Sequence, residues 1–185
     1  MCKLLDKVQP KNKEQLKQLI NYAFKHNIYD LNFIDTSEIT DMSKLFMSCD
    51  YNIDVSRWDV SNVKNMCQIF YGCIRLNTDL SVWNVSNVTD MNHMFFCCEN
   101  FDIKCFDSWD VSNVTDMTSM FAFCNKFDCD LSNWDVSNVT GMYYMFGHCK
   151  QFDCDLSHWN TSKVKDMKNM FTGCNRLTIP DWYKQ

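Results

Sequence analysis

Residues 109–117 read WDVSNVTDM, and residues 134–142 repeat this phrase with Gly141 in place of the last aspartate. Near copies run through the chain of 185 residues. The tryptophans that begin the phrase are spaced by 25, 26, 25 and 25 residues, at Trp58, Trp83, Trp109, Trp134 and Trp159. A fixed period of this size is typical of repeat proteins, in which each unit buries its apolar side only against its neighbours. The sequence therefore predicts a stack of similar coils.

Three further columns of residues keep the same period in six copies. The methionines are Met42, Met66, Met91, Met117, Met142 and Met167. The phenylalanines are Phe46, Phe70, Phe95, Phe121, Phe146 and Phe171, and the cysteines are Cys49, Cys73, Cys98, Cys124, Cys149 and Cys174. One inserted residue within Asp102–Ser108 explains the interval of 26, and it predicts a bulge in the third coil.

Each unit has two halves with different apolar periods. Trp134 and Val136 alternate with Asp135, which predicts a short, half-buried strand. From Val139 to Cys149 the apolar residues are spaced by three, three, one and three positions, which predicts a short helix. Threonine stands at the helix N-cap in this interpretation, and acids suited to the helix dipole follow it at Asp41, Asp90, Asp116 and Asp166. The fold prediction is an α/β repeat solenoid with one short parallel strand and one short helix in each coil.

The ends of the chain differ from the repeat and predict three segments. Residues 1–30 form an N-terminal capping helix region, and its apolar stripe is Leu16, Leu19, Ile20, Ala23 and Phe24. Residues 31–178 form the six-coil solenoid. Residues 179–185 form a C-terminal cap, in which Trp182 falls two residues short of the register and is expected to close the core rather than continue the repeat.

Composition narrows the class of protein. Hydrophobic residues make up 46% and charged residues 22%, which indicates a globular chain. The net charge of -5 disfavours binding to nucleic acid. The chain has neither a signal-peptide pattern nor a run of about 20 apolar residues, so no membrane insertion is expected. These features predict a cytoplasmic monomer with reduced thiols and no cofactor.

The repeated cysteines and aspartates leave an alternative function open. Each cysteine of the column closes an apolar stripe and is expected to pack as a small hydrophobic residue. Cys129 and Cys154 occupy equivalent places in neighbouring coils and are the best candidates for a thiol pair, with Cys105 displaced from their row by the insertion. Stacked Asp rows could supply oxygen ligands to calcium, although no metal-binding motif is present. The alternative is therefore a metal- or redox-responsive repeat protein.

Partner binding is expected at residues that face outward beside the tryptophans. Variation at these positions does not disturb the core, so binding specificity can be encoded there. The candidates are Arg57, Asp59, Asn84, Asp110, Asn133, Asp135, His158 and Asn160. The Met and Phe columns are assigned to the core, and the sequons at Asn87, Asn113 and Asn138 to the repeat consensus. No nucleophile–base set or phosphate loop is found, so an enzyme is not predicted.

The phrases WDVSNVTDMTSMFAFC (109–124) and FDCDLSNWDVSNVTGMYYMFGHC (127–149) resemble the BspA-like leucine-rich-repeat proteins, and more specifically the Mycoplasma-type surface-lipoprotein repeat. The resemblance covers about residues 28–178. It implies a leucine-rich-repeat-like solenoid and, in many members, adhesion or protein binding at the cell surface or after secretion. The expected function is a non-catalytic scaffold that binds a protein partner through its outer sheet face and adjoining loops.

Overall fold

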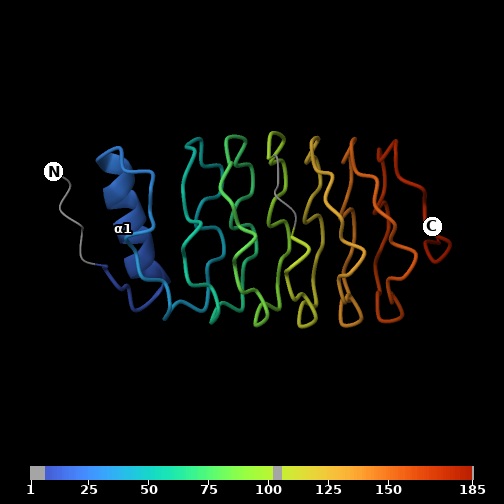
Figure 1. Ribbon diagram of the computed structural model, residues 1–185, viewed down its shortest axis with the longest axis horizontal. Helices are drawn as coiled ribbons and strands as arrows, with labels where there is room; N and C mark the ends of the chain where they lie inside the picture. The colour runs from blue at the N-terminus through green and yellow to red at the C-terminus, as the bar shows by residue number, and fades with distance from the viewer. Residues whose placement is uncertain (1–6, 102–105, 185) are drawn as a thin grey trace.

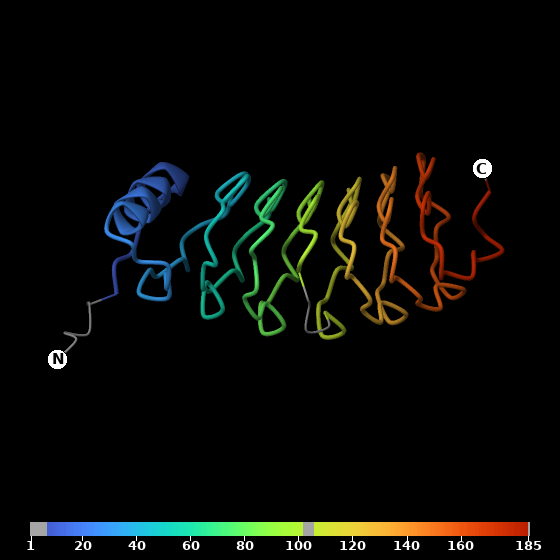
Figure 2. The same cartoon turned by 90° about the horizontal axis from the view of Figure 1, so that it is seen from above.

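The computed structural model describes residues 7–101 and 106–184. Helix α1 (Lys13–Lys25) stands at one end, coils of irregular backbone follow side by side along the longest axis, and the C-terminus lies at the other end (Figure 1). From above, each coil is a narrow loop and the loops stand in register (Figure 2). The predicted bulge within Asp102–Ser108 lies largely outside the described residues.

The predicted leucine-rich-repeat-like α/β solenoid is wrong. In the described part of the chain, α1 is the only helix, and parallel pairing is limited to isolated bridges, so no sheet forms. Five of these bridges link successive coils at one position: Asp41–Asn65, Asn65–Asp90, Asp90–Asp116, Asp116–Gly141 and Gly141–Asp166. Neither a strand nor a helix therefore recurs in the coils.

Consecutive β-turns replace the predicted strand and helix. In one coil, backbone bonds close turns from Leu80 to Trp83 (3.1 Å), Val85 to Val88 (2.8 Å), Met91 to Met94 (3.1 Å) and Phe95 to Cys98 (3.0 Å). The first and fourth residues of each turn are buried. Asn84 joins the first two turns, so Trp83 and Val85 alternate with a polar residue without forming a strand. The spacing of three that suggested a helix is equally the spacing between the ends of a turn.

The two turns of the segment Met-x-x-Met-Phe-x-x-Cys, here called the double turn, share an unusual backbone. The third residue of each turn has positive φ, for example 52° at His93 and 58° at Cys97, which is the signature of a type II turn. The first row of such residues is Lys44, Gln68, His93, Ser119, Tyr144 and Asn169. The second row is Ser48, Gly72, Cys97, Phe123, His148 and Gly173. A right-handed helix cannot accommodate these alternating left-handed residues.

The acids predicted at helix N-termini have a different role. The Oδ1 atom of Asp116 accepts a hydrogen bond from the backbone N–H of Thr118 at 2.8 Å, and Asp41, Asp90 and Asp166 each bond the N–H two residues onward. Such Asx turns fix the entry to the double turn. The helix-capping prediction at these positions is therefore wrong, because there is no helix to cap.

Backbone hydrogen bonds hold neighbouring double turns together. The N–H groups of Met66, Gln68, Phe70 and Gly72 donate to carbonyls of the next coil at 2.9, 2.9, 3.0 and 2.7 Å. In each of the other coils that a further coil follows, too, every second N–H group of the double turn donates to a carbonyl of the next coil, so these bonds hold successive coils in register.

Side chains of the repeated phrase add a second set of bonds between coils. The Trp109 Nε1–H donates to the Leu80 carbonyl at 3.0 Å, and the Asn113 amide donates to the Ser86 carbonyl at 2.7 Å. Equivalent amide bonds at Asn87 and Asn138 show that the sequon asparagines join coils. The phrase repeats because each of these residues bonds the preceding copy.

The core is a continuous column of stacked rings. Centroids of Phe70, Phe95, Phe121 and Phe146 follow one another at 5.6, 5.7 and 5.8 Å with nearly parallel planes. The methionines beside them, Met94, Met120, Met145 and Met170, are fully buried, as predicted. Burial of these columns supplies the main driving force for stacking the coils.

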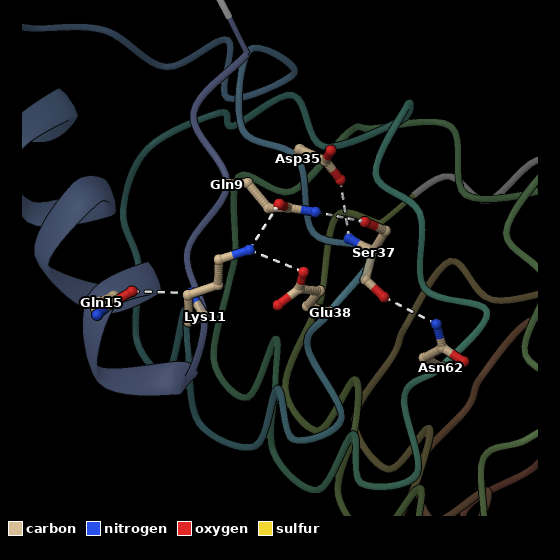
Figure 3. Close-up of polar contacts among 7 residues, drawn as sticks. All are labelled: Gln9, Lys11, Gln15, Asp35, Ser37, Glu38 and Asn62. Atoms are coloured by element: carbon tan, nitrogen blue, oxygen red, sulfur yellow. Dashed lines mark hydrogen bonds and ion pairs between the residues drawn. The ribbon is translucent and has the colours of Figure 1, made fainter.

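Helix α1 lies at the N-terminal end of the stack, beside the first coil (Figure 1). Asn12 caps α1 through a 3.0 Å bond from the Gln15 N–H, and Leu16, Ile20 and Ala23 are buried against the first coil. The segment before the helix is fastened by polar contacts, drawn in Figure 3. There the Lys11 ammonium donates to Glu38 at 2.8 Å.

At the other end, Trp182 occupies a place equivalent to that of the repeat tryptophans, although its position in the sequence is two residues out of register. Its Nε1–H donates to the Leu156 carbonyl at 2.8 Å, as the other tryptophans do to their preceding coils. It also stacks on Trp159 at 6.4 Å. The two-residue shift in sequence is absorbed without loss of this bond.

Candidate functional site

All eight residues predicted to bind a partner are exposed. They form a row along the stack beside the tryptophans, but this row does not lie on a sheet. Five of them bond the backbone two residues onward; the Asp110 Oδ1 atom, for example, accepts from the Ser112 N–H at 3.0 Å. The others of this kind are Asp59, Asn84, Asp135 and Asn160. These side chains thus stabilise turns as well as face solvent.

Four cysteines of the column are buried, Cys49 and Cys174 are partly exposed, and the thiols bond to the backbone. The thiol of Cys124 donates to the Phe95 carbonyl at 3.0 Å, and Cys73, Cys98, Cys149 and Cys174 do the same to the preceding coil. Burial is the main cause that raises the thiol pKa values, to about 12 at Cys73 and about 11 at Cys174. Neutral thiols of this kind are poor nucleophiles and poor metal ligands.

The predicted thiol pair is not joined. Cys129 and Cys154 are both buried and form no disulfide with each other, and burial raises the pKa of Cys154 to about 11. The Cys154 sulfur accepts the Leu131 N–H at 3.2 Å. Cys105 lies outside the described residues. Within residues 7–101 and 106–184, no three His, Cys, Asp or Glu side chains are grouped so that they could hold a metal ion.

A second surface, on the double turns, carries a cluster of aromatic side chains. Aromatic rings lie partly exposed on the outer side of the double turns across four coils. We call these residues the aromatic strip: Tyr71, His93, Phe96, Phe123, Tyr144 and His148. Large apolar side chains on a surface mark interaction sites when they are contiguous, whereas isolated ones need no explanation.

The rings of the strip touch one another from coil to coil. Tyr71 stacks on Phe96 at 4.8 Å, and Phe96 meets the edge of Phe123 at 5.4 Å. Phe123 stacks on His148 at 4.9 Å and lies 5.8 Å from Tyr144. The strip is therefore one continuous surface rather than a set of separate rings.

Two glycines provide space for the strip. A Cβ atom on Gly147 would lie 2.6 Å from the Tyr144 ring, so that ring rests directly on the backbone. A Cβ atom on Gly173 would lie 2.6 Å from the His148 Nδ1 atom. The ring positions thus depend on small residues in the second turns of two successive double turns.

Carboxylates border the strip. The His93 Nδ1 atom lies 2.5 Å from the Asn92 Oδ1 atom, and the Asn92 amide donates to the Asp116 Oδ2 atom at 3.2 Å. Burial, followed by the negative charge of Asp116, raises the pKa of Asp90. Burial also lowers the pKa of His93, although both acids act in the opposite direction. The border is negative, and His93 is mainly neutral near pH 7.

Sequence reasoning missed this surface because the double turn was interpreted as a helix. All six strip residues occupy the variable positions of Met-x-x-Met-Phe-x-x-Cys. The available signal was the frequency of rings at those variable positions, from Tyr71 to His148. In a helix the side chains at these positions would point in different directions around the helix axis. In the double turns they lie on one face of the stack.

Fold and surface together define a stacked-coil repeat protein built of β-turns, with an outward aromatic surface. The chain belongs to the family described as Mycoplasma protein of unknown function, DUF285, whose family model matches residues 14–107 and again residues 100–183. No curated protein and no solved structure matches the chain. Among the described residues, no helix is long and apolar enough to span a membrane.

Proposed function

We propose that this protein is a non-catalytic scaffold that binds a protein partner through the aromatic strip. The observation that carries the proposal is the strip itself, because its rings pack against each other and yet remain partly exposed. Aromatic residues are enriched in protein interfaces, where their rigid rings bury large areas with little loss of conformational entropy.

The stack suits this role because its core does not depend on the strip. Inward residues of the turns and the bonds between coils hold the fold, so the side chains of the strip can be replaced by smaller ones without disturbing the core. The stack also keeps the rings in place before binding, which reduces the entropy lost on association. The row of exposed polar residues beside the tryptophans supplies a second surface, centred on Asp110 and Asp135.

A crosslinking experiment in intact cells tests the proposal. We expect the double variant Phe123→Ser/Tyr144→Ser to lose partners that the unchanged chain captures, with circular dichroism showing that the fold persists. The control is Val82→Ser, which removes an apolar side chain that is 75% exposed elsewhere on the stack. Unchanged recovery with the double variant would refute the strip as the binding surface.

A further variant distinguishes binding by the aromatic strip from binding by the polar row. Charge reversal at Arg57, Asp110, Asp135 and His158 alters the outward polar row and leaves the strip intact. We expect partner capture to survive this change. Loss of capture here, with retention in the strip variant, would assign binding to the polar row instead.

A further inference from the structure

The surroundings of the aromatic strip contain acidic side chains but no lysine or arginine on the strip itself. Between Tyr71 and His148, the outward positions of the double turns hold neither lysine nor arginine. The nearest bases at such positions are Lys44 and Lys168, towards the two ends of the stack. Asp90 and Asp116 follow the border of the strip in neighbouring coils, where they form one of the parallel bridges.

The two acids retain capacity to accept hydrogen bonds. The Asp90 Oδ1 atom accepts the Asn92 N–H at 2.9 Å, while its Oδ2 atom has no hydrogen-bond partner within the described residues. Asp116 uses Oδ1 for the Thr118 N–H and Oδ2 for the Asn92 amide. A cation placed along this border would offset the repulsion between the two like charges.

The aromatic rings favour the same kind of ligand. Faces of Phe and Tyr rings attract cations through the ring quadrupole, and arginine is the cation found there most often. Its planar guanidinium can stack on a ring and still donate hydrogen bonds to a carboxylate at its edge, which the compact lysine ammonium cannot do. Rings and carboxylates on one surface thus match arginine in both respects.

We propose that the partner segment bound on the aromatic strip is an extended, arginine-rich peptide. This inference rests on the proposed function and adds the chemistry of the partner. Guanidinium groups contact the exposed parts of His93 and Phe96, whose ring centroids lie 5.3 Å apart, and pair with Asp90 and Asp116, which both act electrostatically on His93. The rest of the segment follows the stack from coil to coil.

Fluorescence anisotropy with a labelled short peptide of alternating arginine and glycine tests the inference at physiological salt. We expect saturable binding that the pair Asp90→Asn/Asp116→Asn weakens about tenfold. Asparagine is compatible with the fold at these positions, since Asn65 makes the same turn bond to Cys67 at 2.9 Å. A matching peptide of serine and glycine should bind no better than background.

The matched control is Asp59→Asn/Asp110→Asn. It changes the net charge equally, at exposed turn positions where Asn84 and Asn160 already occur. We expect little change in affinity from this pair. Equal weakening by both pairs would show a general charge effect and overturn the inference, as would equal binding of a lysine–glycine peptide.

The strip variant Phe123→Ser/Tyr144→Ser makes the two proposals distinguishable. It should weaken the arginine peptide and also abolish capture of the cellular partner. If the cellular partner still depends on the strip but the arginine peptide does not bind, the inference about its chemistry is wrong and the proposed function stands. If the variant alters neither, the proposed function is wrong as well.

Discussion

At the scale of single residues, the double turns place side chains in backbone conformations that usually require glycine. Eleven non-glycine residues of the described chain have positive φ, and ten of them lie in double turns; Asn27 is the exception. Each costs about 1 kcal/mol or more relative to an unstrained conformation. Gly72 and Gly173 show that glycine fits the second row. Most side chains at these positions lie on the outer surface of the stack.

Ser48→Gly should raise the free energy of unfolding by about 0.5 kcal/mol. The substitution removes the strain of a left-handed serine, and the greater conformational entropy of glycine in the unfolded chain offsets part of this gain. Ser48 is exposed and has φ of 57°, so the substitution removes strain without removing a buried side chain. Urea denaturation measures the change. The control is Ser137→Gly, at a turn position outside the positive-φ rows, which should destabilise the protein. Destabilisation by both would contradict the assignment of strain to Ser48.

At the scale of the coil, hydrogen bonds to the next coil hold the double turn. The N–H groups of Tyr144, Phe146 and His148 donate to the following coil at 3.1, 3.0 and 2.6 Å. The corresponding N–H groups of the last double turn, at Asn169 and Phe171, have no such acceptor within the described chain. Trp182 and Tyr183 supply rings to this end but not the row of carbonyls.

Amide hydrogen exchange should therefore differ between the last two coils. We expect the Tyr144 and Phe146 amides to exchange much more slowly than those of Asn169 and Phe171, because exchange of a bonded amide requires local opening. Exchange measured residue by residue with nuclear magnetic resonance at neutral pH checks this expectation. Similar protection in both coils would mean that the last double turn is covered by another chain or segment.

At the scale of the whole molecule, buried thiols couple stability to alkaline pH. Burial raises the pKa of Cys73 to about 12 and of Cys174 to about 11, and raises those of Cys98, Cys124 and Cys149 well above 9.0. Above pH 9.0 the unfolded chain releases thiol protons that the folded chain retains. Because the unfolded state then binds fewer protons, stability falls as pH rises.

The free energy of unfolding, measured by urea denaturation with reductant present, should decline from about pH 9 towards pH 11. Cys73→Ser keeps a hydroxyl donor for the Phe46 carbonyl and removes one raised pKa. We expect this variant to reduce the slope by up to about 1 kcal/mol per pH unit. An unchanged slope would indicate that other groups cause the decline.

Stacking and the identity of the core could be predicted from sequence because both depend on periodic apolar residues. The Met, Phe and Trp columns are buried as expected, except that Met167 is partly exposed, and Leu16 and Ile20 of α1 are also buried. The local structure could not be predicted in the same way. A spacing of three between Met142 and Met145 fits a helix and a β-turn equally, and only the backbone φ of Tyr144 distinguishes them.

The phrase at residues 109–117, together with its near copies, determined the period and the inward columns, because burial of apolar side chains at a fixed interval permits little but a stack of similar units. Tertiary structure alone decided that each unit is a series of β-turns. The reason is that hydrogen bonds from one coil to the next satisfy backbone groups that a helix would pair within itself. The same bonds hold the left-handed residues in place and so bring Phe96, Phe123 and Tyr144 together on one outer surface.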